Sequence, residues 1–295
     1  MQFNNIYQLD NLDILNELSQ SDTKFDLILT DPPYNVGMDF GNNTDKQKTE
    51  KYLSDMQTRI KLLSSVLSDR GSVIWFCSHK WLREMLNMFH SNLYYQRMLI
   101  WHYRNGLSRQ TNSPVTEYEP FLWFTKHPNI YTYNGDDIRV PYKSERVKNP
   151  VYKKNKLGEK VAWNPDPRGA KRGDVWEYPV LSGALYKDER TEHPTQKPIS
   201  LFSDLLKAFC PKDGEKYRGK VLDIYSGSGT TAVCCEYLNN LGNEIEWICC
   251  EIEKKWVDIS LERLSHVKCL KHQHSEFDMF PTLRHVAQNE SPPLD

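Results

Sequence analysis

The feature that most constrains the fold of this chain is a regular alternation of apolar runs and amphipathic segments towards its C-terminus. Residues 221–225 and 245–250 are apolar runs of buried-strand length, and 230–238 and 253–267 carry apolar side chains at helical spacing. Strands that alternate with helices form a parallel sheet, because each helix carries the chain back across it. We therefore predict an α/β protein with a doubly wound, mostly parallel sheet and helices on both faces.

The N-terminal part repeats this alternation. Apolar runs predict strands at 4–7, 25–29, 72–77, 97–103 and 120–125, and helical spacing predicts helices from about residues 12, 53 and 81, the second ended by Asp69-Arg70-Gly71. From 129 to 190 prolines, charges and scattered aromatic residues replace the periodicity, and a helix resumes at Pro198. The sequence thus predicts one domain over 1–270, an irregular insertion over 129–190 within it, and a polar tail over 271–295.

Composition narrows the class of protein. The 295 residues contain no apolar stretch long enough to cross a membrane, and the N-terminus lacks the basic and apolar regions of a signal peptide. The seven cysteines show no zinc-like spacing, and two adjacent pairs lie inside apolar periodic segments. We expect no membrane partner, no metal site, and buried free thiols in a reducing cytoplasm.

The net charge of −1 hides an uneven distribution. Residues 139–172 contain eleven Lys or Arg and three Asp or Glu, a local charge of +8 that the rest of the chain offsets with −9. A local positive field on a nearly neutral protein favours a polyanionic partner. A lysine-rich loop that only faces solvent is the alternative.

A stiff polar turn, Asp31-Pro32-Pro33-Tyr34, follows the predicted strand at 25–29. Ligands of open α/β sheets bind outside the carboxyl ends of the strands. The prolines fix the backbone and carry no N–H, so we expect nearby carbonyls to join Asp31 as acceptors aimed at a cleft, with the ring of Tyr34 beside them. Such a set suits an exocyclic NH2 group on a planar heterocycle, although an ordinary strand-to-loop turn is the simpler alternative.

A glycine turn lies between the strand at 221–225 and the next helix. Gly227-Ser228-Gly229-Thr230-Thr231-Ala232 reads G-x-G-x-x-A, and Glu251 ends the following strand 22 positions after Gly229. The glycines let the backbone approach a ligand, the helix N-terminus faces an anionic group, and the acid accepts ribose hydroxyls. NAD and S-adenosylmethionine (SAM) both satisfy this turn.

The remaining motifs decide between these cofactors. The Asp-Pro-Pro-Tyr turn has no role in hydride transfer but suits acceptance of an amino group. His193-Pro194-Thr195-Gln196-Lys197-Pro198 supplies Thr195 and Lys197 as partners for a carboxylate, the anionic group that SAM carries.

With these motifs in this order, the sequence resembles the β-class of SAM-dependent amino-group DNA methyltransferases, over most of 5–126 and 163–265. The resemblance implies a Rossmann-like fold with permuted motif order, a target-recognition insertion, and methyl transfer from SAM to adenine N6 in a specific sequence of double-stranded DNA after base flipping. N4-cytosine is the alternative target, and Asp31 favours adenine because family members that act on cytosine more often have Ser there. The family usually has Pro or Phe directly after the motif's Asp and Phe just before the loop. This sequence has Ile224 and Tyr225 at those two positions.

The resemblance also implies the role of each site residue. The catalytic set is Asp31, Pro32, Pro33 and Tyr34. The cofactor set is Asp10, Asp31, Thr195, Lys197, Asp223, Tyr225, Ser226, Gly227, Ser228, Gly229, Thr230, Thr231 and Glu251. The predicted DNA contacts are Arg104, Asn105, Arg109, Lys153, Lys154, Lys156, Arg168, Lys171 and Arg172.

Several alternatives stay open at this point. Asp10 also suits a helix N-cap, Lys197 a surface position, and Asp223 a purely structural role in the turn. An NAD-binding oxidoreductase and a non-catalytic SAM-sensing DNA-binding protein are the alternatives from other classes. The resemblance places the protein in a prokaryotic or phage cytoplasm and suggests a homodimer and a cognate restriction endonuclease as partners, which the sequence itself does not decide.

Overall fold

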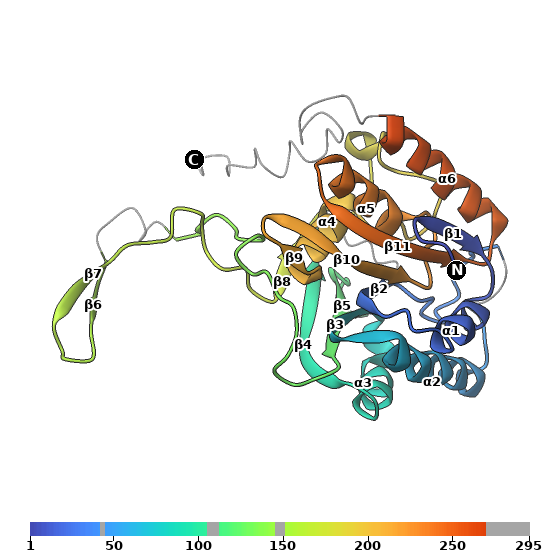
Figure 1. Ribbon diagram of the computed structural model, residues 1–295, viewed down its shortest axis with the longest axis horizontal. Coiled ribbons are helices and arrows are strands. Elements are labelled where there is room, and N and C mark those ends of the chain that lie inside the picture. The colour runs from blue at the N-terminus through green and yellow to red at the C-terminus, as the bar shows by residue number, and fades with distance from the viewer. Residues whose placement is uncertain (42–44, 105–111, 145–150, 270–295) are drawn as a thin grey trace.

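The computed structural model describes residues 1–41, 45–104, 112–144 and 151–269, and it is built around one large sheet (Figure 1). Within the described residues the strand order is β1-β11-β10-β2-β3-β5-β4-β8, with β9 paired to β10. Five strand pairs of this sheet are parallel, whereas β5 runs antiparallel to β3 and β4. The predicted mostly parallel α/β sheet is confirmed.

Seven strands of this sheet overlap the predicted apolar runs, whereas β8 and β9 were not predicted. Their bounds are β1 Asn5–Gln8, β2 Phe25–Thr30, β3 Leu67–Phe76, β4 Tyr94–His102, β5 Tyr118–Thr125, β8 Val175–Glu177, β9 Lys212–Asp213, β10 Lys216–Asp223 and β11 Glu244–Glu251. The carboxyl-terminal halves of the central strands β2, β10 and β11 are mostly buried, which explains why these stretches read as continuous apolar runs instead of alternating ones.

Helices cover both faces of the sheet, as predicted. They are α1 Asn11–Ser19, α2 Thr49–Val66, α3 Leu82–His90, α4 Ile199–Phe209, α5 Thr230–Asn240 and α6 Lys254–Cys269, with short 3-10 turns η1 His79–Trp81 and η3 Ala184–Tyr186. Side chains of α1, α2 and α3 belong to one hydrophobic cluster, and those of α4, α5 and α6 belong to another. The sheet therefore separates two cores, with α1, α2 and α3 on one side and α4, α5 and α6 on the other (Figure 1).

One helix boundary differs from the prediction. Helix α2 ends at Val66 and strand β3 begins at Leu67, so Asp69-Arg70-Gly71 lies in the strand and does not terminate the helix. Phe25 pairs with Leu67 and Leu27 with Ser72, so the extra residues of β3 form a bulge against β2. The charged residues of the bulge looked like a turn in the sequence because they face solvent.

The predicted irregularity of 129–190 is wrong in two places. Val151–Lys154 (β6) and Lys160–Trp163 (β7) form an antiparallel hairpin that extends away from the sheet (Figure 1). Strand β8 joins the main sheet beside β4, with Ile100 paired to Val175. The hairpin was not predicted because every described side chain from 152 to 162 is exposed. The sequence therefore lacks the alternation of apolar and polar residues that predicts a half-buried strand.

Two further expectations concern composition. Six cysteines are free and buried, as predicted. The side chain of the seventh, Cys269, is not among those that the structure describes. In the described ranges no helix is long and apolar enough to cross a membrane. The polar tail over 271–295 lies outside the described residues.

Candidate active site

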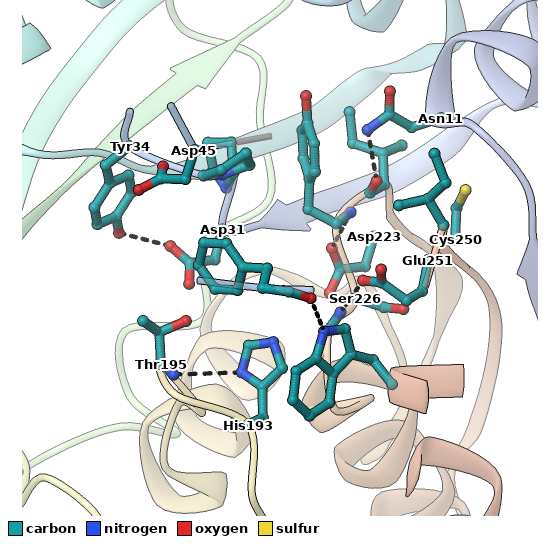
Figure 2. A pocket seen from close by; sticks show the side chains of 18 of the residues that line it. Asn11, Asp31, Tyr34, Asp45, His193, Thr195, Asp223, Ser226, Cys250 and Glu251 are labelled. Atoms are coloured by element: carbon teal, nitrogen blue, oxygen red, sulfur yellow. Dashed lines mark hydrogen bonds between the residues drawn. The ribbon is translucent and has the colours of Figure 1, made fainter. Parts of the chain in front are cut away.

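A cavity of about 300 Å³ opens at the carboxyl ends of β2, β10 and β11. Asp31, Tyr34, Ser226 and Glu251 all line it, although they come from segments far apart in the sequence (Figure 2). Its position agrees with the rule that ligands of open α/β sheets bind at the strand ends, where the strand order reverses.

The Asp31 carboxylate lies in the wall of this cavity, directly after β2. Oδ1 accepts a hydrogen bond from the hydroxyl of Tyr34 at 2.6 Å, and Oδ2 lies 2.6 Å from Nζ of Lys197. The side chain of Asp31 is 17% exposed and that of Lys197 only 5% exposed. This largely buried ion pair fixes the orientation of the carboxylate.

A second carboxylate, Glu119, belongs to the same cluster. It lies near the start of β5, and Oε2 is 3.0 Å from the hydroxyl of Tyr34 and 3.1 Å from Nζ of Lys197. Because β5 runs antiparallel to β3, its beginning meets the carboxyl ends of the parallel strands. Glu119 was not predicted as a site residue, and its only signal in the sequence is its position as an acid immediately before the apolar run at 120–125.

Burial and charge change the protonation behaviour of this cluster. Burial raises the pKa of Asp31 above its usual value, and the charge of Lys197 opposes that rise. Burial alone would lower the pKa of Lys197, but the charges of Asp31 and Glu119 outweigh it and raise that pKa. Burial, with the charges of the two acids, also raises the pKa of Tyr34 well above its usual value. Lys197 therefore stays charged and Tyr34 stays a neutral hydroxyl.

The carbonyls of the proline turn are not all available as acceptors. The Pro33 carbonyl accepts a hydrogen bond from the hydroxyl of Tyr52 at 3.1 Å, and the Tyr34 carbonyl accepts one from Nε1 of Trp81 at 2.7 Å. The expectation of partner-free carbonyls is therefore wrong for Pro33. Pro32 and Pro33 both line the cavity.

The loop after the proline turn folds against the same cavity. The carboxylate of Asp45, which is 1% exposed, accepts hydrogen bonds from the backbone N–H groups of Asn35, Val36 and Met38. Nε1 of Trp256 in α6 donates to the Phe40 carbonyl at 2.9 Å. Val36, Met38 and Phe40 thereby become an apolar wall of the cavity.

The glycine turn after β10 forms the opposite wall. Gly227 and Gly229 have φ of +50° and +75°, a conformation that favours glycine. A Cβ at Gly227 would lie 2.7 Å from Nε2 of His193, and one at Gly229 would lie 2.7 Å from Cβ of Ser260. Among the predicted turn residues, Tyr225, Ser226, Gly227, Ser228 and Thr230 line the cavity, whereas Gly229 and Thr231 lie behind it.

Asp223 holds the turn together. Its carboxylate accepts hydrogen bonds from the hydroxyls of Thr30 at 2.8 Å and Thr231 at 2.6 Å, and from the backbone N–H of Tyr225 at 3.1 Å. Burial raises the pKa of Asp223 to about 6, although these hydrogen bonds oppose the rise. Asp223 thus has the structural role in the turn that was considered as an alternative, and it also lines the cavity.

Glu251 and Ser226 present polar groups that suit a nucleoside. The Glu251 carboxylate accepts hydrogen bonds from the backbone N–H groups of Gly227 at 3.0 Å and Glu253 at 2.9 Å. Burial raises its pKa to about 7. Oγ of Ser226 is buried without a hydrogen-bond partner, a state that a bound polar ligand would relieve. Glu251 and Ser226 line the cavity beside the backbone of Gly227, and this set of groups fits SAM.

The other predicted cofactor residues lie at the rim of the same cavity. Asp10 caps α1 by accepting a hydrogen bond from the N–H of Leu12 at 2.8 Å, so the N-cap alternative is confirmed, and it also pairs with Arg59 at 3.2 Å. Thr195 lines the cavity, and its backbone N–H lies 3.4 Å from Nδ1 of His193. Burial lowers the pKa of His193 to about 3, so its imidazole is neutral.

The predicted DNA contacts fall into three groups. Asn105 and Arg109 lie outside the described residues. Lys153, Lys154 and Lys156 are exposed on or beside β6, Lys171 is also exposed, and Arg104 is 78% exposed and pairs with Glu177 at 2.6 Å. Arg168 is bound to Asp166 and Asp136 at 2.9 and 3.2 Å.

Arg172 belongs to the core. Its guanidinium pairs with Asp204 at 2.8 Å, donates to the Ile138 carbonyl, and stacks over the rings of Trp176 and Tyr178. Its side chain is 12% exposed, so it is not presented to a partner.

Comparisons with known proteins identify the family of this chain. A sequence model of the DNA methylase family N6_N4_Mtase matches residues 25–262. The Type II methyltransferase M.HpaI from Haemophilus parainfluenzae is 31% identical over 264 residues, which cover 89% of this chain and 72% of the relative. The DNA adenine methyltransferase YhdJ from Escherichia coli (strain K12) is 28% identical over 249 residues, covering 81% of this chain and 76% of the relative.

A solved structure shares the fold. The crystal structure of the M1.HpyAVI–SAM complex matches with a TM-score of 0.56 and 24% identity, and the match covers 88% of this chain and 98% of that one. The family match overturns the oxidoreductase alternative, because it spans both the proline turn and the glycine turn. The chain belongs to the N6_N4_Mtase family of DNA methylases.

Proposed function

We propose that the protein methylates the N6 amine of adenine within a specific sequence of double-stranded DNA. The observation that carries this proposal is the Asp31 carboxylate, held at the cavity wall by Lys197 and Tyr34. In the resembled family a carboxylate at this position favours adenine over cytosine. YhdJ, a relative named as a DNA adenine methyltransferase, supports the same target.

The chemistry follows from the acceptors at the end of β2. The lone pair of an exocyclic amine is delocalised into the ring, which makes the amine a poor nucleophile. Asp31 and the Pro32 carbonyl would accept its two N–H groups, draw the nitrogen towards tetrahedral geometry and localise the lone pair. Because the acceptors are held before the substrate arrives, positioning supplies most of the rate enhancement.

S-adenosylmethionine is the cofactor, and it supplies the methyl group when bound. Glu251 would accept the ribose hydroxyls, Asp10 would lie near the adenine ring, and Ser226 and Gly227 would contact the methionine part. Thr195 remains the proposed partner of the methionine carboxylate.

The target base must leave the helix to reach this cavity. Flipping a base costs a few kcal/mol, and an aromatic face in the site offsets part of that cost. The ring of Tyr34 is the proposed stacking surface, since its hydroxyl is anchored by the acids of the cluster and its orientation is fixed. Two-stranded ribbons fit the major groove, so we propose that the β6–β7 hairpin with Lys153, Lys154 and Lys156 contacts the DNA.

Other proposed contacts to DNA are Arg104, Arg168 and Lys171, and, outside the described residues, Asn105 and Arg109. M.HpaI is named as a Type II methyltransferase, which supports a restriction–modification context and a cognate endonuclease for this chain. A homodimer is a further proposal, carried only by the family resemblance.

Product analysis tests the proposed target. DNA treated with the protein and methyl-labelled SAM would be digested to nucleosides and separated by mass spectrometry. We expect N6-methyladenine. N4-methylcytosine would replace the proposal by the second candidate, which the family also contains. Sequencing of the methylated positions in the same DNA would give the recognition sequence.

A further inference from the structure

The hydroxyl of Tyr34 makes more contacts in the Asp31 cluster than its single hydrogen can satisfy. The Tyr34 hydroxyl oxygen lies 2.6 Å from Oδ1 of Asp31 and 3.0 Å from Oε2 of Glu119. A hydroxyl carries one hydrogen, so Tyr34 can donate to one of these carboxylates at a time. The other contact becomes a hydrogen bond only when that carboxyl group itself carries a proton. The cluster therefore contains a position for one additional proton.

The methyl-transfer reaction releases one proton at this place. The amine begins with two N–H bonds and ends with one, and the nitrogen carries a positive charge until the second bond breaks. We propose that this proton passes from the amine to Asp31 and then, through the hydroxyl of Tyr34, to Glu119. Glu119 is thereby the final acceptor within the site, and it acts through Tyr34 without touching the substrate.

Each step of this transfer conserves protons and electron pairs. An N–H bond of the methylated amine breaks, its electron pair stays on nitrogen, and an O–H bond forms at Asp31. The proton on Asp31 then moves to the phenolic oxygen of Tyr34 while the original phenolic hydrogen moves to Oε2 of Glu119. Asp31 returns to its carboxylate form, Tyr34 is unchanged, and Glu119 holds the proton until solvent removes it.

The surroundings of the cluster favour this direction. Burial raises the pKa of Asp31, so this carboxyl accepts a proton more readily than an exposed aspartate does. The raised pKa of Tyr34 excludes a free phenolate, so the hydroxyl transfers protons only as a bridge. The side chain of Glu119 is 25% exposed and that of Asp31 is 17% exposed, so Glu119 is the carboxylate nearer to solvent.

Lys197 forms ion pairs with both carboxylates and holds them close together. Its Nζ lies 2.6 Å from Asp31 and 3.1 Å from Glu119, and its single positive charge offsets one of the two negative charges. The uncompensated negative charge is what an arriving proton neutralises. Cys77 and Tyr103 are the other titratable groups whose interactions involve Glu119, and burial raises the pKa of both to about 12, so they remain neutral.

Single-turnover kinetics with two variants test the relay. Glu119→Gln keeps the shape of the side chain but cannot take up the proton, and Tyr34→Phe keeps the stacking ring but removes the bridge. We expect each variant to slow methyl transfer at saturating SAM and DNA at least tenfold, with both dissociation constants within threefold of the wild type. The double variant should be no slower than the slower single one, because both changes interrupt one path. Glu117→Gln, an exposed acid two positions away, is the matched control.

Chemical rescue separates a proton acceptor from a packing role. Formate should restore at least part of the rate of Glu119→Ala and none of the rate of Asp31→Ala, which loses the substrate contact itself. A Glu119→Gln rate within threefold of the wild type would overturn the relay. A double variant whose fold reduction in rate equals the product of the two single reductions would overturn it as well. The relay rests on methyl transfer to an exocyclic amine, whichever base carries it, so identification of N4-methylcytosine as the product would refute the proposed target and leave the relay standing.

Discussion

The ammonium nitrogen of Lys197 lies 2.6 Å from Oδ2 of Asp31, although the two residues are 166 positions apart in the chain. The sequence suggested that Lys197 binds the carboxylate of the cofactor, and that role stays a prediction. The observed partners favour a different role, in which Lys197 positions the catalytic acid.

Replacement of Lys197 distinguishes the two roles. Lys197→Met keeps the length of the side chain, leaves Asp31 and Glu119 without their cation, and should lower turnover at least a hundredfold. The dissociation constant of SAM, measured by calorimetry, should change less than threefold. A tenfold weaker SAM complex with near-normal turnover would instead restore the cofactor role. Circular dichroism checks that the variant is folded.

SAM affinity should depend on pH through Glu251. In the proposed role of Glu251, the ionised carboxylate would accept ribose hydroxyls, so binding would favour the charged form, whereas burial raises the pKa of Glu251 in the free site to about 7. Affinity should therefore rise as pH increases from 6 and level off above about 7. Glu251→Gln should weaken binding about tenfold or more, as expected for loss of a charge-assisted hydrogen bond of about 1.5–3 kcal/mol, and should remove this pH dependence. An unchanged constant in a folded variant would mean that another group holds the ribose.

The basic hairpin should contribute to DNA affinity without setting the site. Changing Lys153, Lys154 and Lys156 to Glu should weaken binding to all duplexes and flatten the dependence of log affinity on log salt, by about 0.9 for each phosphate that the protein no longer neutralises. Phosphate contacts do not read bases, so the methylated sequence should stay the same. A salt titration and methylation-site mapping measure the two effects.

A matched control for the hairpin variant reverses Lys51, Lys61 and Lys254, which are exposed on α2 and α6. These helices lie on the side of the molecule opposite the hairpin (Figure 1). Equal reductions of affinity in both triple variants would show a general effect of net charge and would remove the hairpin from the DNA footprint.

Arg172 should matter for stability and not for DNA contact. Arg172→Ala leaves Asp204 without its cationic partner and removes the stacking over Trp176, so the free energy of unfolding should fall by about 3 kcal/mol. Lys171→Ala, an exposed neighbour, should change it by no more than about 0.5 kcal/mol. Urea denaturation measures both. Normal stability combined with weaker DNA binding in Arg172→Ala would return this residue to the DNA surface.

Local patterns were enough to predict the two walls of the cavity. Asp31 follows an apolar run, Gly227 opens a turn, and Glu251 ends a strand, so each position follows from the rule that strand ends form the site. The fold was predictable for the same reason, since strand and helix periodicities are local properties of the chain.

Contacts between distant segments could not be predicted from one sequence. Glu119 contacts Tyr34 and Lys197 beside Asp31 because β5 is antiparallel to its neighbour, and a run of apolar residues does not specify strand direction. Arg172 and Lys153 contribute equally to the positive charge of 139–172 in the sequence. In the structure Arg172 packs against aromatic rings, whereas Lys153 is exposed on a hairpin.

Methyl transfer is proposed to depend on Asp31, and one pair of measurements tests this dependence. Asp31→Ala would be assayed for methyl transfer from labelled SAM to DNA, and the same sample would be titrated with SAM by calorimetry. We predict that transfer is abolished while SAM affinity falls only slightly, because the other proposed partners of the cofactor, Glu251 and the glycine turn, are unchanged. Transfer within tenfold of the wild-type rate would show that methyl transfer does not depend on Asp31.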